Sequence, residues 1–148
     1  MGRPFNKILI PIDGSRYAMQ AADYGISLAK NYGSRIISLY VIDKASLASL
    51  GKIEKDRSNG LRQRLQREGE NCLRDLQGRA EAAGVEFAGL VKEGTPHRVI
   101  VALAKEEGVD LILIGKVGQR GPRRILIGSV TERVIESAPC PVLVVRPT

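Results

Sequence analysis

Glycines at fixed spacing in the last third of the chain are the residues whose positions most directly suggest a chemistry. Gly115 and Gly118 follow the apolar run from Asp110 to Ile114, and Gly128 and Ser129 come just before a helical pattern. Backbone N–H groups beside glycine can approach an anion closely, and a following helix N-terminus adds a partial positive charge. This segment therefore predicts phosphate binding, and with it a nucleotide ligand.

The rest of the chain predicts the elements that must position this segment. Short apolar runs, separated by amphipathic helical patterns, alternate along 148 residues. That alternation is typical of a parallel sheet with helices on both faces. We expect one domain, residues 1–148, with an open five-stranded α/β sheet in the order 3-2-1-4-5 and a long, polar, mobile connection at residues 43–60. The predicted strands are Lys7–Ile12, Arg35–Ile42, Val85–Val91, Asp110–Ile114 and Pro141–Val145.

The predicted strand order also places the site. Ligands of such sheets bind outside the carboxyl ends of the strands, where the strand order reverses. The first and fourth strands flank that point, and their carboxyl ends carry Asp13 and Gly115. We therefore expect the Asp13 turn and the glycine segment to face each other across one crevice.

The glycine spacing differs from two familiar phosphate motifs, since the chain has no G-x-x-x-x-G-K-[ST] and no G-x-G-x-x-G after its first strand. It reads G-x2-G-x9-G-S, with Gly115, Gly118, Gly128 and Ser129 as the fixed positions. This pattern resembles that of the ATP-binding branch of the universal stress protein family. Three further segments are similar to the same family, in the same order: Ile8–Ser15, Leu39–Asp43 and Ala138–Val145.

The resemblance implies a Rossmann-like, adenine nucleotide alpha hydrolase-like fold and an adenine-nucleotide ligand. The ligand would be ATP, or AMP or ADP, with Mg²⁺ held through the phosphates and by no protein side chain. Asp13 would lie near the ribose, the Val41 backbone would meet adenine, and N–H groups with the Ser129 hydroxyl would hold phosphate oxygens. The nucleotide-binding residues implied are Pro11, Asp13, Val41, Gly115, Gly118, Gly128, Ser129 and Val130.

Two of these residues also have purely structural interpretations. Asp13 precedes Gly14, as a turn residue does. Ser129 and Glu132 form an S-x-x-E capping box, which stabilises a helix without any ligand. We expect this capping, and we expect either that the box is loose or that a phosphate takes neighbouring donors, so that an N–H group of residues 128–131 faces the phosphate.

Three arginines, Arg120, Arg123 and Arg124, lie between the second and third glycines of the motif. One interpretation is a solvated basic loop. The other is a flexible phosphate lid, whose guanidinium groups meet the β- or γ-phosphate.

Composition narrows the classes of partner. The net charge of +7, from 23 Lys and Arg against 16 Asp and Glu, favours anionic partners. Aromatic residues are only 4%, and the arginine-rich helix from about Leu61 to Ala83 is interpreted as a solvated face, so nucleic-acid binding is not predicted. No apolar run is long enough for a membrane span or a signal peptide, which makes a cytoplasmic protein the default expectation.

Other chemistry-bearing side chains show no functional pattern. Cys72 and Cys140 lie in no C-x-x-C motif and are interpreted as packed or idle thiols. His97, the single histidine, has no nucleophilic partner at a motif spacing, and no metal-ligand cluster is present. The sequence therefore predicts neither a resident metal held by side chains nor a catalytic triad.

The run Pro141–Val145 is apolar on both faces, yet the predicted order puts it at the sheet edge. Exposed apolar edges pair with other chains, so we expect a homodimer through this strand.

The leading hypothesis is a soluble regulatory nucleotide-binding module of stress response, acting on an unknown protein partner. Without a general base or a Walker-type lysine, rapid hydrolysis is not predicted. The alternatives are a slow ATPase or phosphoryl-transfer enzyme using Asp13, and a dimer module without nucleotide whose basic surface binds an anionic partner.

Overall fold

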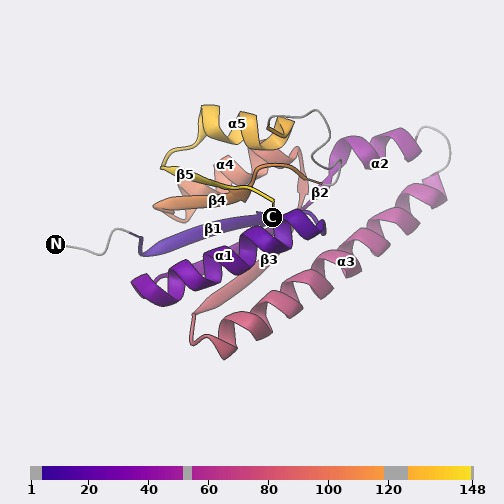
Figure 1. The fold of residues 1–148 in the computed structure, drawn as a ribbon. Helices are drawn as coiled ribbons and strands as arrows, with labels where there is room; N and C mark the ends of the chain where they lie inside the picture. The colour runs from indigo at the N-terminus through magenta and orange to yellow at the C-terminus, as the bar shows by residue number, and fades with distance from the viewer. Residues whose placement is uncertain (1–4, 52–54, 119–126, 148) are drawn as a thin grey trace.

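The computed structural model describes residues 5–51, 55–118 and 127–147. Its strands form one parallel sheet in the order β3-β2-β1-β4-β5 (Figure 1), which confirms the predicted fold class and strand order. The carboxyl ends of all five strands therefore lie at one edge of the sheet. The strands are β1 (Lys7–Ile12), β2 (Arg35–Asp43), β3 (Phe87–Gly94), β4 (Leu111–Gly115) and β5 (Val142–Val145).

Helices cover both faces of the sheet (Figure 1). One core cluster joins the sheet to α1 and α3, and a second joins its other face to α4 and α5. None of the described helices combines the length and apolar composition needed to cross a bilayer. The helices are α1 (Arg16–Tyr32), α2 (Lys44–Gly51), α3 (Lys55–Ala82), α4 (Pro96–Glu106) and α5 (Ser129–Ser137).

Helix α1 is held close to the sheet by its small residues. The Ser15 side chain accepts a hydrogen bond from the Ala18 N–H at 3.2 Å and caps the helix, while Gly33 ends it in the left-handed conformation. A Cβ atom built on Gly25 would lie 2.5 Å from Ile10 Cδ1. The helix backbone therefore approaches β1 as closely as its glycine allows, as the small-residue face predicts.

The prediction of a polar connection at residues 43–60 is wrong in its structure, because this segment contains α2 and the beginning of α3. Asp43 Oδ1 accepts a hydrogen bond from the Ala45 N–H at 3.0 Å, which helps to start α2 directly after β2. Leu47 is only 3% exposed and anchors α2 to the core. With only eight residues, α2 is too short for its apolar residues to show a clear helical period in the sequence.

The third strand begins later and ends later than the predicted Val85–Val91. The Val85 N–H donates to the Ala80 carbonyl at 2.8 Å, beside Gly84 in the left-handed conformation. Val85 therefore completes the C-terminal turn of α3 before the chain enters β3.

Candidate functional site

A crevice opens between β1 and β4, where the strand order reverses. The two strands pair only at Ile8–Leu111 and Leu9–Ile112 and then separate. The Asp110 N–H donates to the Lys7 carbonyl, so by alternation the backbone of Pro11 also faces β4. Because β4 no longer pairs at that level, a proline here removes no ladder hydrogen bond.

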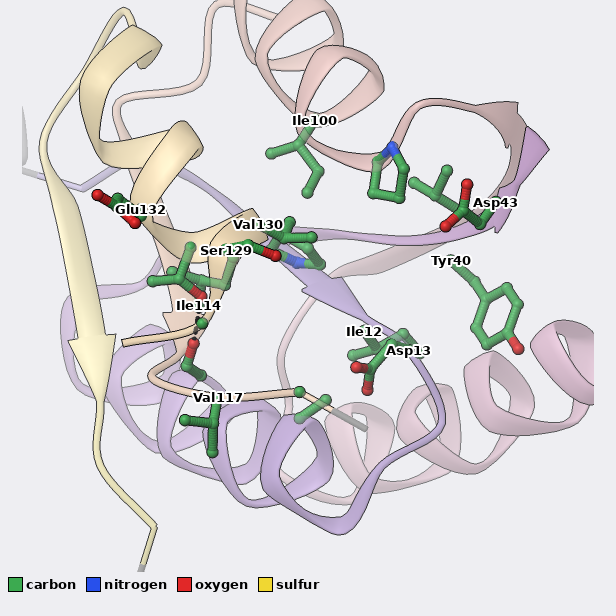
Figure 2. Close-up of a pocket in the computed structure, with 18 of the residues that line it drawn as sticks. Ile12, Asp13, Tyr40, Asp43, Ile100, Ile114, Val117, Ser129, Val130 and Glu132 are labelled. Carbon is green, nitrogen blue, oxygen red and sulfur yellow. Dashed lines mark hydrogen bonds between the residues drawn. The ribbon is translucent and has the colours of Figure 1, made fainter. Parts of the chain in front are cut away.

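A cavity of about 580 Å³ occupies this crevice, within the range of small-molecule sites. Figure 2 shows Asp13 on one side of the opening at the end of β1, and Ser129 and Val130 on α5 on the other. The structure thus brings together every nucleotide-contacting residue that the resemblance implied. Those lining residues are Pro11, Asp13, Val41, Gly115, Gly118, Gly128, Ser129 and Val130.

The start of α5 corrects the predicted capping box. Gly128, in an extended conformation, is the N-cap and makes no side-chain cap, while Ser129 is the first helical residue. The Glu132 N–H donates to the Gly128 carbonyl at 2.9 Å, as in the first helical turn. The prediction is wrong because glycine supplies the extended N-cap conformation itself, which moves serine one position into the helix. The Ser129 side chain is exposed and lines the cavity.

The donors of this turn also differ from the prediction in one place. The Gly128 N–H is taken by the Lys116 carbonyl at 2.8 Å, so it points back into the glycine segment. The N–H groups of Ser129, Val130 and Thr131 belong to the first turn of α5, where no intrahelical acceptor exists. The donors that α5 offers to an anion therefore begin at Ser129.

Thr131 is a supporting residue that sequence reasoning missed. Its side chain is only 4% exposed, and Oγ1 donates to the Gly115 carbonyl at 2.8 Å. This bond ties the first turn of α5 to the end of β4. A polar residue on the inner face of α5, two positions after Ser129, was the available signal.

Asp13 forms the turn that its place before Gly14 predicts, and it also lines the cavity. Oδ1 accepts a hydrogen bond from the Ser15 N–H at 2.9 Å. A Cβ atom on Gly118 would lie 2.6 Å from Oδ2, so the glycine motif leaves room for this carboxylate. The turn holds the Asp13 side chain at the mouth of the crevice.

The backbone of Val41 is placed by the register of β2. The Ile36 N–H donates to the Glu86 carbonyl on the β3 side, so alternation turns the backbone of Val41 toward β1. The last pair between β1 and β2 is Ile12–Tyr40. The polar backbone groups of Val41 are therefore directed to the level where β1 turns away into the crevice.

Tyr40 lines the cavity and was also missed from the sequence. It is 3% exposed, and a Cβ atom on Gly69 would lie 2.6 Å from its ring. Burial, and then the charge and hydrogen bond of Glu68, raise the pKa of Tyr40 to about 12. Gly69, which weakens the helical pattern of α3, was the signal for a close contact at this point.

Among the described lining residues, the charged side chains are the carboxylates Asp13, Asp43 and Glu132, without a lysine, arginine or histidine. Arg120, Arg123 and Arg124 lie outside the described residues. Within the described part, no group of three or more His, Cys, Asp or Glu side chains could hold a metal ion. The donors that the described lining offers are therefore N–H groups and hydroxyl groups.

The remaining reactive side chains lie apart from the cavity lining. Burial is the main cause that raises the pKa of the Cys72 thiol and that of the Cys140 thiol. Both cysteines are half-buried and free. Burial, followed by the charges of Arg133 and Arg98, lowers the pKa of His97.

The sheet order and the crevice at its switch point define a single-domain α/β protein with a doubly wound parallel sheet. The sequence profile of the universal stress protein family matches residues 4–146, so this chain belongs to that family. It is 38% identical over 145 residues to the universal stress protein MJ0531 of Methanocaldococcus jannaschii, a match that covers 96% of this chain and 82% of the relative.

Solved structures of the family have the same fold. The MJ0577 protein aligns with a TM-score of 0.85 and 33% identity over 97% of each chain. The protein UspA from Lactobacillus plantarum aligns with a TM-score of 0.86 and 25% identity, over 99% of this chain and 100% of its own.

Two more distant structures hold nucleotides. A universal stress protein in complex with cAMP has a TM-score of 0.72 and 23% identity, and covers 97% of this chain and 98% of its own. An Arabidopsis thaliana family member with AMP bound has a TM-score of 0.70 and 18% identity, and covers 97% and 92%. At these identities the likeness shows the fold alone.

Proposed function

We propose that this universal stress protein binds an adenine nucleotide, with ATP as the leading candidate, and acts as a homodimeric regulatory module. The observation that carries the proposal is the cavity between β1 and β4. It gathers, from four separate segments, the residues expected to contact a nucleotide. Family structures with AMP and cAMP add support at the level of ligand class.

Each part of the nucleotide has a matching group in the cavity. Adenine pairs with the Val41 backbone, which reaches past the end of β1. The Asp13 carboxylate accepts hydrogen bonds from ribose hydroxyls. Phosphate oxygens accept from the N–H groups of Ser129 and Val130 and from the Ser129 hydroxyl, where the helix N-terminus favours negative charge.

Mg²⁺ fits this site as a partner of the phosphates. The described lining has carboxylates but no basic side chain, so an uncompensated polyphosphate would meet like charge. A bound divalent cation supplies that neutralisation when the nucleotide carries it in. Two of these lining carboxylates belong to the proposed contacts: Asp13 is the proposed ribose contact, and Glu132 follows the proposed phosphate contact Ser129 by three residues.

A binding role, in preference to fast catalysis, follows from the role given to Asp13. Its carboxylate is engaged with the Ser15 N–H and is assigned to the ribose, which leaves it without a function at the γ-phosphate. Binding that orders the cavity wall is a sufficient switch for a regulatory protein.

Calorimetric titration with ATP, AMP, adenosine and GTP, with and without Mg²⁺, tests the proposal. We expect ATP with Mg²⁺ to bind at micromolar or lower concentration, and Asp13→Asn to weaken binding about tenfold, because a charged hydrogen bond contributes on the order of 1.5 kcal/mol. Mass spectrometry of the purified protein checks for a co-purified adenine nucleotide. Failure of every adenine nucleotide to bind, or equal binding of GTP, contradicts the proposal, and steady turnover of ATP would move it to the enzyme class.

A further inference from the structure

Strand β2, helix α3 and the turn between β1 and α1 meet beside Asp13, and they bring Tyr40, Glu68 and Gly14 close together. From β2, the ring of Tyr40 packs against Gly69 of α3, where a Cβ atom would lie 2.6 Å from Cδ1 and 2.8 Å from Cγ. The Tyr40 ring lies against the same turn, because its Cε2 is 3.9 Å from the place of a Cβ atom on Gly14, and burial and then the charge of Glu68 raise the pKa of Tyr40. Glu68 Oε1 in turn lies 2.9 Å from the place where a Cβ atom on Gly14 would stand.

This arrangement places the tip of Glu68 directly against the turn between β1 and α1. Gly14 has a φ of 84°, a conformation that side chains rarely adopt. The Asp13 carboxylate closes the same turn through its hydrogen bond with the Ser15 N–H. Gly14 and Asp13 are thus parts of one small unit, and a shift of Gly14 moves the Asp13 carboxylate.

Asp13 is consequently bounded on two sides. Gly118 lies against Oδ2, at 2.6 Å from the position of its missing Cβ atom. The turn that carries Asp13 is backed by Glu68 and by the edge of the Tyr40 ring. Glu68 is exposed and lies outside the cavity lining, so it can act on a ligand only through this turn.

We infer that Tyr40 and Glu68 are positioning residues for Asp13, in that a hydrogen bond from the Tyr40 hydroxyl keeps Glu68 against Gly14 and so fixes the carboxylate that recognises ribose. The inference rests on the proposed function, which assigns the ribose hydroxyls to Asp13. It concerns discrimination between ribose and deoxyribose nucleotides, because adenine is assigned to Val41 and the phosphates to α5.

The test compares dissociation constants for ATP and for 2′,3′-dideoxy-ATP, both with Mg²⁺. The variants are Tyr40→Phe, which keeps the ring against Gly69, and Glu68→Ala, which removes the carboxylate. Glu68→Gln keeps an acceptor oxygen for the tyrosine hydroxyl. Glu70→Ala is the matched control, because Glu70 is also exposed on α3 but accepts its hydrogen bond from Gln66 of the same helix.

We expect the wild-type protein to prefer ATP, and Tyr40→Phe and Glu68→Ala to reduce that preference about threefold to tenfold, the range of one hydrogen bond. The loss comes from weaker ATP binding, with the dideoxy-ATP constant unchanged. Glu68→Gln and Glu70→Ala keep the wild-type preference. A purely structural role would weaken both ligands equally.

Several results would overturn the inference. They are an unchanged preference in Tyr40→Phe and Glu68→Ala, an equal loss for both ligands, or a loss in Glu68→Gln as large as in Glu68→Ala. If ATP binds with a preference that Asp13→Asn abolishes, these results leave the proposed function standing. Absence of ATP binding by the wild-type protein, or equal binding of ATP and dideoxy-ATP, overturns the ribose role of Asp13 and this inference together.

Discussion

Gly118 lies directly against Asp13, since a Cβ atom at Gly118 would come within 2.6 Å of Asp13 Oδ2. The glycine segment after β4 and the turn after β1 therefore form one wall of the cavity. A side chain at residue 118 would displace the carboxylate or push the segment outward. Gly118 has no left-handed backbone, so the close approach alone explains the glycine.

Gly118→Ala is expected to weaken ATP binding by about tenfold or more, because it displaces a carboxylate assigned to ribose. Titration calorimetry measures the effect, and thermal unfolding shows whether the fold is retained. Asp13→Asn serves as a comparison, and the double variant is expected to lose little more than either single one. Additive losses would show that Gly118 acts on the ligand independently of Asp13.

Two glycines of α3, Gly69 and Gly78, are predicted to change the free energy of unfolding in opposite directions when each is replaced by alanine. Gly78→Ala is expected to stabilise the protein by about 0.5–1 kcal/mol, since nothing lies within 4 Å of the new Cβ atom and alanine favours helix. Gly69→Ala is expected to destabilise it by about 1–3 kcal/mol through overpacking against Tyr40. Urea unfolding measures both, and a stabilised Gly69→Ala would contradict the tight contact.

Ser129 and Thr131 are predicted to separate binding from stability. Ser129→Ala is expected to change the free energy of unfolding by less than about 0.5 kcal/mol, because Ser129 makes no cap hydrogen bond. It should weaken ATP more than adenosine. Thr131→Val leaves the Gly115 carbonyl without its buried donor and is expected to cost about 1–2 kcal/mol. If Ser129→Ala lost as much stability as Thr131→Val, the result would indicate that the Ser129 side chain does cap α5.

Tyr40 is expected to make stability fall at alkaline pH. Its pKa is about 12 in the folded protein, against about 10 when unfolded. The folded state therefore binds more protons between these values, so this contribution is complete below pH 10 and is lost as pH rises toward 12. Two pKa units correspond to on the order of 2 kcal/mol. The unfolding free energy of the wild-type protein should fall relative to that of Tyr40→Phe over this interval, and a constant difference would contradict the shift.

The proposed dimer can be tested at the outer edge of β5. The Lys116 N–H donates to the Val145 carbonyl and the Ile112 N–H to the Pro141 carbonyl, so alternation turns the backbone of Val144 outward. Val144→Pro removes an outward N–H while leaving the β4–β5 ladder intact. We expect a dimer mass by light scattering for the wild-type protein and for Val144→Thr, and a monomer for Val144→Pro. A wild-type monomer at micromolar concentration would refute pairing through this strand.

Residue patterns alone were sufficient for the main architecture. Buried strands such as Leu111–Gly115 carry dense apolar runs, and Ser15 and Gly33 mark the ends of α1 by their own conformational preferences. These signals depend on neighbouring residues in the chain, so they can be interpreted without knowing which distant segments come into contact. The crevice also followed from order, because a 3-2-1-4-5 sheet must separate its first and fourth strands at the carboxyl edge.

The sequence by itself, together with the family resemblance that it carries, thus determined the fold class, the strand order and eight of the residues that line the cavity. Only the tertiary structure decided how those residues are used. Gly128, and not Ser129, caps α5 because the Gly128 N–H reaches the Lys116 carbonyl. Gly69 is required by the ring of Tyr40 on another element, and a side chain on Gly14 would meet Glu68 of α3. Such contacts join segments far apart in the chain, and their geometry exists only after the helices have packed on the sheet.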